Sequence, residues 1–101
     1  MVEPVCTREE ALLRLRRLFP ELSRFGVRTL ALFGSFARGE SGPESDVDIL
    51  VEFEGPARFD RFMELRRLLE ETLGRRVDLV THRALKPRLK QRIEREALRV
   101  A

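Results

Sequence analysis

The hydrophobic positions near the N-terminus recur at helical spacing. A capping-box sequence, Thr-Arg-Glu-Glu, begins at Thr7 and predicts a helix that runs to about Leu18. Pro20 breaks or restarts this helix, and residues 21–25 are expected to form a short turn that ends at Gly26. The expected buried face of the helix consists of Ala11, Leu12, Leu15, Leu18 and Phe19.

Two strand-like runs follow, and a polar connection separates them. Residues 27–33 are apolar and partly β-branched up to Gly34, and residues 35–38 resemble one helical turn. Residues 39–45 contain Gly, Ser and Pro and are expected to form a loop. Residues 47–53 then alternate with the period of a strand. One face carries Val47, Ile49, Val51 and Phe53, and the other carries Asp46, Asp48, Leu50 and Glu52.

The second half of the chain predicts two more helices and a third strand. A long amphipathic helix closes at Gly74, and its apolar positions are Phe59, Phe62, Leu65, Leu69 and Leu73. Residues 77–80 form the third strand, and residues 98–100 are a candidate edge strand. Pro87 begins the last helix, whose expected buried side consists of Leu89, Ile93 and Ala97.

This alternation of helices and strands predicts an α/β (α+β) fold, with a small three- to four-stranded mixed sheet and helices packed on one face. With 101 residues, of which 43% are hydrophobic, the chain is expected to form a single domain over residues 1–101 with its own core. Cys6 is the only cysteine, which fits a reducing cytoplasm. No segment is long and apolar enough to span a membrane, so no membrane association is expected.

The charges are distributed unevenly along the chain. Residues 40–54 contain six acids and no base, whereas residues 83–99 contain seven bases and two acids. An acidic cluster in a basic protein indicates a bound cation. The basic run is interpreted as the solvated face of the last helix. A direct nucleic-acid contact is the weaker alternative, because no aromatic residues for base stacking are interleaved.

Three aspartates are the candidate metal ligands. Asp46 and Asp48 leave the same face of one strand, roughly 6.6 Å apart along the chain. Asp78 lies in another strand. If the two strands are adjacent, the carboxylates would lie about 5 Å apart, and the electrostatic repulsion within each pair would cost roughly 3 kcal/mol at an effective dielectric of ~20. The positive charge of Mg²⁺ would reverse the sign of this term. Oxygen ligands and retained waters suit this ion, and substrate phosphates would complete its shell.

The Gly34-Ser35 turn is a candidate phosphate site. Glycine lets the backbone approach a phosphate, and amides at a helix start carry partial positive charge. Ser35 is also compatible with a plain N-cap role, and Arg38 with either a phosphate contact or a solvated position. Two Mg²⁺ ions are expected to serve one in-line displacement at the α-phosphorus of a nucleoside triphosphate, with Asp78 as the proton acceptor.

The motif Gly34-Ser35-Phe36-Ala37-Arg38-Gly39, followed by Ser45-Asp46-Val47-Asp48, resembles the minimal nucleotidyltransferase domains of the polymerase-beta superfamily, over nearly the whole chain. The resemblance implies a small mixed α/β fold in which Asp46, Asp48 and Asp78 bind two Mg²⁺. It also assigns the triphosphate contacts to Gly34 and Ser35, and Arg38 matches the arginine of the family motif.

Several prokaryotic members of this group are antitoxins paired with a helical HEPN-type ribonuclease toxin. They transfer AMP from ATP to a tyrosine of the toxin. Larger relatives carry an additional helical domain for the acceptor, and no such domain is expected within these 101 residues. The resemblance therefore implies that a HEPN-type partner brings the acceptor group, or that an oligomer of the chain completes the site. The sequence has no tyrosine, which excludes tyrosine self-modification. A binding module that neutralises a toxin without catalysis remains the alternative.

Three other residues have open roles. His82 follows the third strand and is interpreted as a polar loop histidine, with a nucleotide contact as the weaker alternative. Phe59 is expected in the core with its helical neighbours. Phe36 is expected to be exposed beside the Gly-Ser turn, where it would contact a base or a partner.

Overall fold

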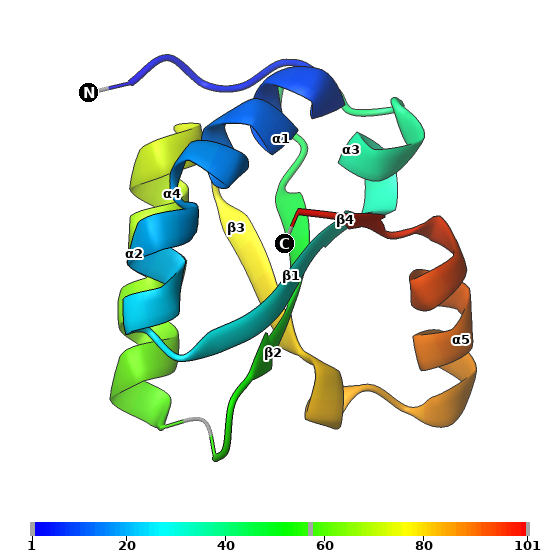
Figure 1. The fold of residues 1–101 in the computed structure, drawn as a ribbon. Coiled ribbons are helices and arrows are strands. Elements are labelled where there is room, and N and C mark those ends of the chain that lie inside the picture. Colours follow the sequence, from blue (N-terminus) through cyan, green and yellow to red (C-terminus); the bar gives the residue numbers. More distant parts are fainter. Residues whose placement is uncertain (1, 57, 101) are drawn as a thin grey trace.

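A four-stranded sheet with the order β3-β2-β1-β4 forms the centre of the computed structural model, which describes residues 2–56 and 58–100 (Figure 1). β1 is antiparallel to both β2 and β4, whereas β2 and β3 are parallel. The strands are β1 Val27–Phe33, β2 Val47–Phe53, β3 Val77–Thr81 and β4 Leu98–Arg99. The predicted mixed sheet is therefore confirmed, and the candidate edge strand lies next to β1.

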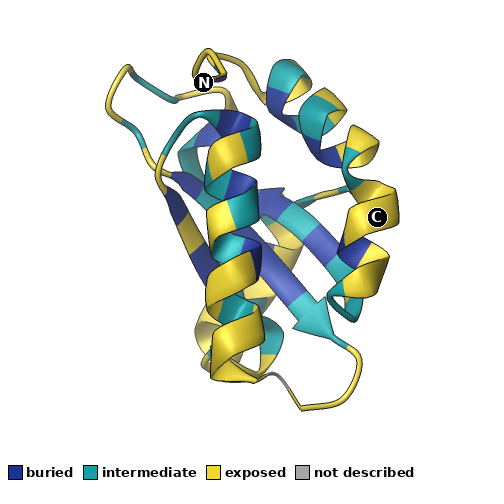
Figure 2. Ribbon diagram, turned by 90° about the vertical axis from the view of Figure 1, so that its left-hand side faces the viewer, coloured by how far each residue is buried: buried dark blue, intermediate teal, exposed yellow. Residues whose placement is uncertain are grey.

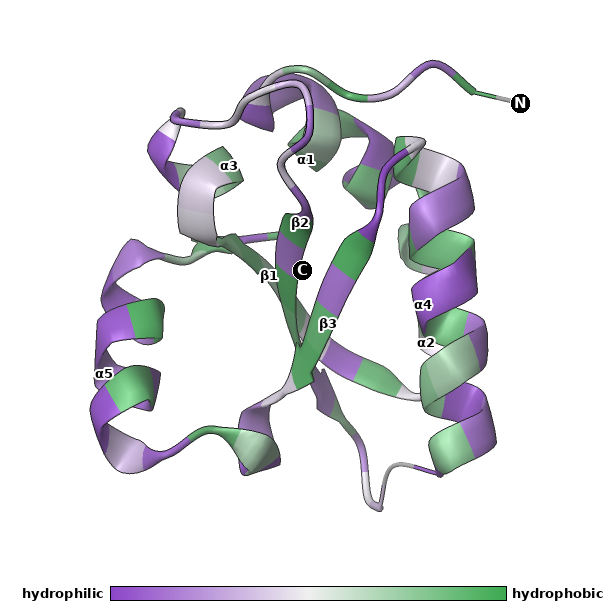
Figure 3. Cartoon of the chain, turned by 180° about the vertical axis from the view of Figure 1, so that it is seen from behind, coloured by the Kyte–Doolittle hydropathy of each residue, from purple (hydrophilic) through white to green (hydrophobic). Residues whose placement is uncertain are grey.

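The helices occupy both sides of this sheet. They are α1 Arg8–Arg17, α2 Phe19–Arg24, α3 Gly34–Arg38, α4 Phe59–Leu73 and α5 Pro87–Glu96, with a 3₁₀ turn η1 at His82–Ala84. α1, α2 and α4 lie on one side, as expected, whereas α5 lies on the other (Figures 1 and 3). The crossovers β2-α4-β3 and β3-α5-β4 run in opposite directions across the sheet, so the same right-handed preference places their helices on opposite faces.

The main core lies between the sheet and the first helical layer. The two central strands contribute five buried side chains to this core: Leu30, Leu32, Val47, Ile49 and Val51. They pack with buried positions of the helices, among them Ala11, Leu15, Leu22, Leu65, Leu69 and Leu73. In Figure 2 the outer side of α4 is exposed while the strands behind it are largely buried. The helical and strand periodicities of the sequence therefore identify most of this core. Phe19, which they place on the buried face of the first helix, is 49% exposed, so that expectation is wrong.

The local signals at the helix ends are confirmed. The Thr7 hydroxyl accepts a hydrogen bond from the backbone N–H of Glu10 at 3.2 Å, which caps α1. α4 ends at Gly74 in the left-handed conformation (φ 68°), and Pro87 is the first residue of α5. No helix in the described part of the chain is long and apolar enough to cross a membrane.

The residues after Pro20 differ from the prediction. They belong to the short helix α2, not to a turn, because proline is tolerated in the first turn of a helix, where the N–H groups have no intrahelical acceptor. The helix places Leu22 in the core with only 1% of its surface exposed. Gly26 follows with φ 73° and starts the approach to β1.

Four hydrophobic residues lie in environments that periodicity does not predict. Phe36 is fully buried, because α3 folds back against β1 and β2. Phe59 is 79% exposed, as the first residue of α4, and Leu89 is 48% exposed on α5. Leu50 is buried even though it lies on the same face of β2 as Asp48. The expected exposure of Phe36 and the expected burial of Phe59 and Leu89 are therefore wrong.

Candidate functional site

Asp48 and Asp78 occupy paired positions on adjacent parallel strands. In the register of β2 and β3, Asp48 stands opposite Asp78, as Val47 stands opposite Val77 and Ile49 opposite Leu79. Paired residues point to the same face, so both aspartates lie on the face opposite the main core. Each strand shows a hydrophilic band among hydrophobic positions (Figure 3). Asp46 is exposed just before β2.

Gly34 brings the Gly-Ser turn against Asp48. It adopts φ 72°, and a Cβ built on it would stand 3.0 Å from Cγ of Asp48 and closer still to Oδ2. β1 also pairs with β2 at Phe33 and Asp48, which explains the close approach. Only a residue without a side chain fits between the start of α3 and this carboxylate.

The environment of Asp48 disfavours a negative charge. Its pKa is raised by burial first, then by the nearby carboxylates of Asp78 and Asp46, and the positive charge of Arg38 opposes this shift. Among the described residues, no three Asp, Glu, His or Cys side chains converge closely enough to hold a metal ion. The donor set still fits Mg²⁺, which proteins commonly bind through one or two carboxylates together with substrate phosphates and waters.

Ser35 is the second residue of α3. The N-cap of this helix is Phe33, in an extended conformation, and no side chain caps the helix start. The alternative that Ser35 is itself the N-cap is therefore wrong. The carbonyl of Ser35 accepts a hydrogen bond from the N–H of Glu40 at 2.8 Å, which closes the turn after the helix.

Arg38 is held by two carboxylates. Its Nε lies 3.0 Å from Oε2 of Glu40, and its Nη1 lies 3.3 Å from Oε2 of Glu96 in α5. The hydrogen bond with Glu40 raises the pKa of the guanidinium. The influence of Arg38 on Asp48 shows that its charge acts at the acidic face. Sequence spacing does not identify Glu96, which comes from the far end of the chain.

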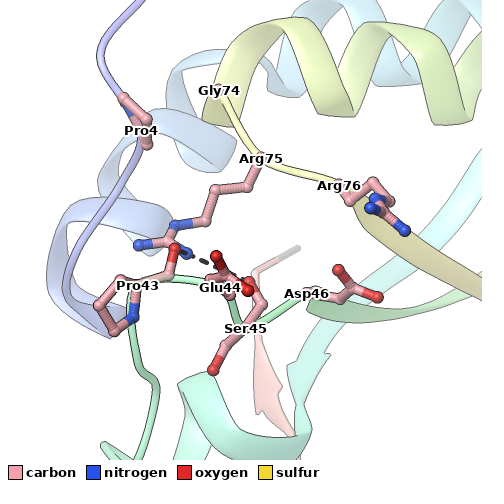
Figure 4. Close-up of a pocket in the computed structure, with 8 residues that line it drawn as sticks. All are labelled: Pro4, Pro43, Glu44, Ser45, Asp46, Gly74, Arg75 and Arg76. Carbon is pink, nitrogen blue, oxygen red and sulfur yellow. Dashed lines mark hydrogen bonds between the residues drawn. The ribbon is translucent and has the colours of Figure 1, made fainter.

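Asp46 lies at the boundary of two open pockets. One, of about 370 Å³, is formed with loop residues and with Arg75 and Arg76 (Figure 4). The other, of about 260 Å³, is shared with Asp78, Phe62, Arg66 and Arg76. Asp46 is thus accessible to a ligand from two sides. His82, in contrast, lies past the C-terminal end of β3 and pairs with Glu94 at 3.1 Å, as a polar residue outside the acidic face.

Residues 11–100 match the nucleotidyltransferase domain family. A Thermococcus cleftensis protein named protein adenylyltransferase MntA is 48% identical over 77 residues, which cover 76% of this chain and 78% of that protein. A Methanocaldococcus jannaschii protein, provisionally named a protein adenylyltransferase, is 45% identical over 86 residues, or 84% of this chain and 91% of its own.

Solved structures agree with this assignment. A structure described as a minimal nucleotidyltransferase has 38% identity and a TM-score of 0.82, covering 92% of this chain and 95% of its own. A toxin–antitoxin structure with AMP-PNP has 25% identity and a TM-score of 0.69, and the match covers 95% of this chain and 73% of the chain in that structure. A tri-AMPylated HEPN toxin of Shewanella oneidensis in complex with an MNT antitoxin contains a chain of the same fold, with 22% identity, a TM-score of 0.67 and coverage of 90% and 71%.

The chain therefore belongs to the nucleotidyltransferase domain family. Within that family it is a nucleotidyltransferase of the minimal type, and its named relatives are protein adenylyltransferases. The resemblance seen in the Gly-Ser and Asp-x-Asp motifs is thereby confirmed.

Proposed function

We propose that the chain, acting as one minimal nucleotidyltransferase domain over residues 1–101, transfers AMP from ATP to a hydroxyl group of a protein partner. The observation that carries this proposal is the contact of Gly34 with Asp48, which is itself paired with Asp78. It joins a phosphate-binding turn and a carboxylate pair on one face of the sheet.

In this proposal the backbone around Gly34 and Ser35 receives the triphosphate, as amides at the start of a helix do. Arg38 exchanges one of its carboxylate partners for a phosphate oxygen. Asp46, Asp48 and Asp78 would hold Mg²⁺, two ions in all, together with phosphate oxygens of the substrate and waters. Bound Mg²⁺ neutralises phosphate charge and lowers the barrier for displacement at phosphorus.

The reaction is an in-line displacement at the α-phosphorus. The hydroxyl oxygen of the acceptor forms a new bond to phosphorus, and the bond between the α-phosphorus and the bridging oxygen of pyrophosphate breaks. Asp78, exposed on the edge strand, accepts the proton of the hydroxyl. Pyrophosphate leaves with the electron pair, and the products are an AMP ester of the acceptor and pyrophosphate.

The acceptor is proposed to be a small helical HEPN-type toxin in the cytoplasm. Support comes from the name of the Thermococcus relative and from the two toxin–antitoxin structures, one with AMP-PNP and one with an AMPylated toxin. A direct nucleic-acid substrate is not part of the proposal.

The test is to combine the purified chain with Mg²⁺, ATP and the product of the adjacent gene, and to measure the intact mass of that partner. A mass increase of one or more AMP groups is expected, and chelation of Mg²⁺ abolishes it. An unchanged partner mass, in a complex that demonstrably forms, contradicts the proposal.

A second candidate function is neutralisation of the toxin by occlusion. The engagement of Arg38 by both Glu40 and Glu96 favours it, since this arginine is paired within the protein. The variant Asp46→Asn/Asp48→Asn separates the two functions. Cells that produce the toxin survive with this variant if occlusion suffices, and they stop growing if AMP transfer is required.

A further inference from the structure

Arg75 links segments that are distant in the sequence. It follows Gly74, the C-cap of α4, and precedes β3, which carries Asp78. Its Nη1 donates to three backbone carbonyls of the loop between α3 and β2: Gly42 at 3.2 Å, Pro43 at 3.0 Å and Ser45 at 3.2 Å. Figure 4 shows the guanidinium reaching across the pocket to this loop.

The same guanidinium contacts α3, the helix before the loop, and Ser45 near the end of the loop. Its Cζ lies 5.2 Å from the centroid of the Phe36 ring, and Phe36 is the buried anchor of α3, two residues after Gly34. Ser45 directly precedes Asp46. Arg75 also donates through Nε to the carbonyl of Val5, a fully buried residue of the N-terminal segment.

The charge of Arg75 is directed to backbone dipoles. Within residues 2–56 and 58–100, no carboxylate forms an ion pair with it. The loop has its own small turn, in which the N–H of Gly42 donates to Oγ of Ser45 at 2.8 Å and the N–H of Ser45 donates to the carbonyl of Gly42 at 3.2 Å. Arg75 fixes this turn relative to α3 and β3.

We propose that Arg75 is a positioning residue of the nucleotide site, which sets the spacing between the Gly34-Ser35 turn and Asp46. This inference rests on the proposed function. Arg75 does not touch the triphosphate; it acts through the loop and through Phe36. A lysine reproduces only part of this role, because its single ammonium group lacks the planar fork that serves several carbonyls and stacks on a ring.

The experiment measures two quantities in each variant: the Kd for Mg²⁺–ATP by calorimetry and amide hydrogen exchange over residues 40–46. The test variants are Arg75→Met and Arg75→Lys. Arg67→Met, at an exposed position of α4, controls for the loss of one positive charge. Leu69→Val, in the core, controls for a loss of stability alone.

Arg75→Met is expected to raise the Kd about tenfold, the size seen when a supporting residue of a ligand site is lost, and to speed exchange in the loop. Arg75→Lys gives an intermediate result in both measurements. Arg67→Met and Leu69→Val keep the Kd of the unmodified protein. If Arg75→Met does not fold, Arg75→Lys decides, because it retains the charge and part of the hydrogen bonding.

An Arg75 variant that is folded, binds Mg²⁺–ATP as tightly as Leu69→Val and keeps slow exchange in the loop overturns the inference. The failure of the proposed function looks different: the unmodified protein then binds no Mg²⁺–ATP. In that case the exchange data still decide the loop role, since slow exchange in Arg75→Met contradicts it and fast exchange confined to residues 40–46 supports it.

Discussion

Asp48 and Asp78 are register partners on the parallel strands β2 and β3, so the sheet itself holds two carboxylates side by side. Burial of Asp48 and the proximity of Asp78 raise its pKa above that of a free aspartate. The ionised carboxylate of Asp48 therefore lowers the free energy of unfolding at neutral pH. A cation bound beside it would offset this loss of stability.

The first prediction concerns the stability of the variant Asp48→Asn and its response to Mg²⁺–ATP. Without nucleotide, this variant is expected to be more stable than the unmodified protein by about 1 kcal/mol, because it removes a charge that burial disfavours first and the carboxylates of Asp78 and Asp46 disfavour further. Mg²⁺–ATP is expected to raise the Tm of the unmodified protein and to leave that of the variant unchanged. Thermal unfolding with and without Mg²⁺–ATP measures both effects.

Glu52→Gln is the matched control, since Glu52 lies on the same face of β2 but is not among the neighbours that shift the pKa of Asp48. It should retain the Mg²⁺–ATP effect. An equal rise in Tm for Asp48→Asn and the unmodified protein would argue against ligation by Asp48.

The second prediction concerns the contact of Gly34 with Asp48. Gly34→Ala is expected to cost at least about 3 kcal/mol, from a positive φ and from a collision with the carboxylate. Gly55 has φ 76°, and no atom lies within 4 Å of the place that a Cβ would occupy, so Gly55→Ala should cost only about 1 kcal/mol. Chemical denaturation of both variants gives the difference. Equal losses would show that the collision is relieved without cost.

The third prediction compares two phenylalanines whose environments are the reverse of those expected from the sequence. Phe36→Ala is expected to lower the free energy of unfolding by about 3–5 kcal/mol, because it leaves a cavity under α3. Phe59→Ala, at a 79% exposed position, should change it by less than about 0.5 kcal/mol. Urea unfolding of the two variants distinguishes a buried from an exposed ring. A small loss for Phe36→Ala would contradict its burial.

The fourth prediction concerns the competition for Arg38. Glu96→Gln removes one of the two carboxylate partners of Arg38 and should tighten binding of Mg²⁺–ATP only about threefold, because an ion pair at the surface is weak. Arg38→Met should weaken binding. Calorimetric titration measures both, and Glu94→Gln, which affects the His82 pair instead, serves as the control. No change in either Arg38→Met or Glu96→Gln would remove Arg38 from the nucleotide site.

Local signals in the sequence predict much of this fold. The capping box at Thr7, the glycine after α4 and the proline at the start of α5 are backbone preferences that act over a few residues, and each defines a helix end. The motif spacing likewise singles out the Gly-Ser turn and the Asp-x-Asp segment, which the structure brings into contact at Gly34 and Asp48. The alternation in β2 correctly places Asp48 on the face opposite Ile49, since strand geometry alone determines it.

Tertiary packing determines what the sequence leaves open. Phe36 is buried because α3 folds back onto the sheet, and a five-residue helix has no periodicity that shows this. Leu89 is exposed because α5 is seated mainly through Ile93, although both follow helical spacing. Arg75 and Glu96 reach the site from distant segments, and no local pattern distinguishes them from the other charged residues of this chain.

The most direct measurement of AMP transfer uses two parallel reactions with the HEPN-type partner, one with ATP labelled at the α-phosphorus and one with ATP labelled at the γ-phosphorus. Displacement at the α-phosphorus predicts label on the partner only from the α-position, and none when Asp46→Asn/Asp48→Asn replaces the unmodified protein. Label from the γ-position, or no label from either in an intact complex, would contradict nucleotidyl transfer to the partner.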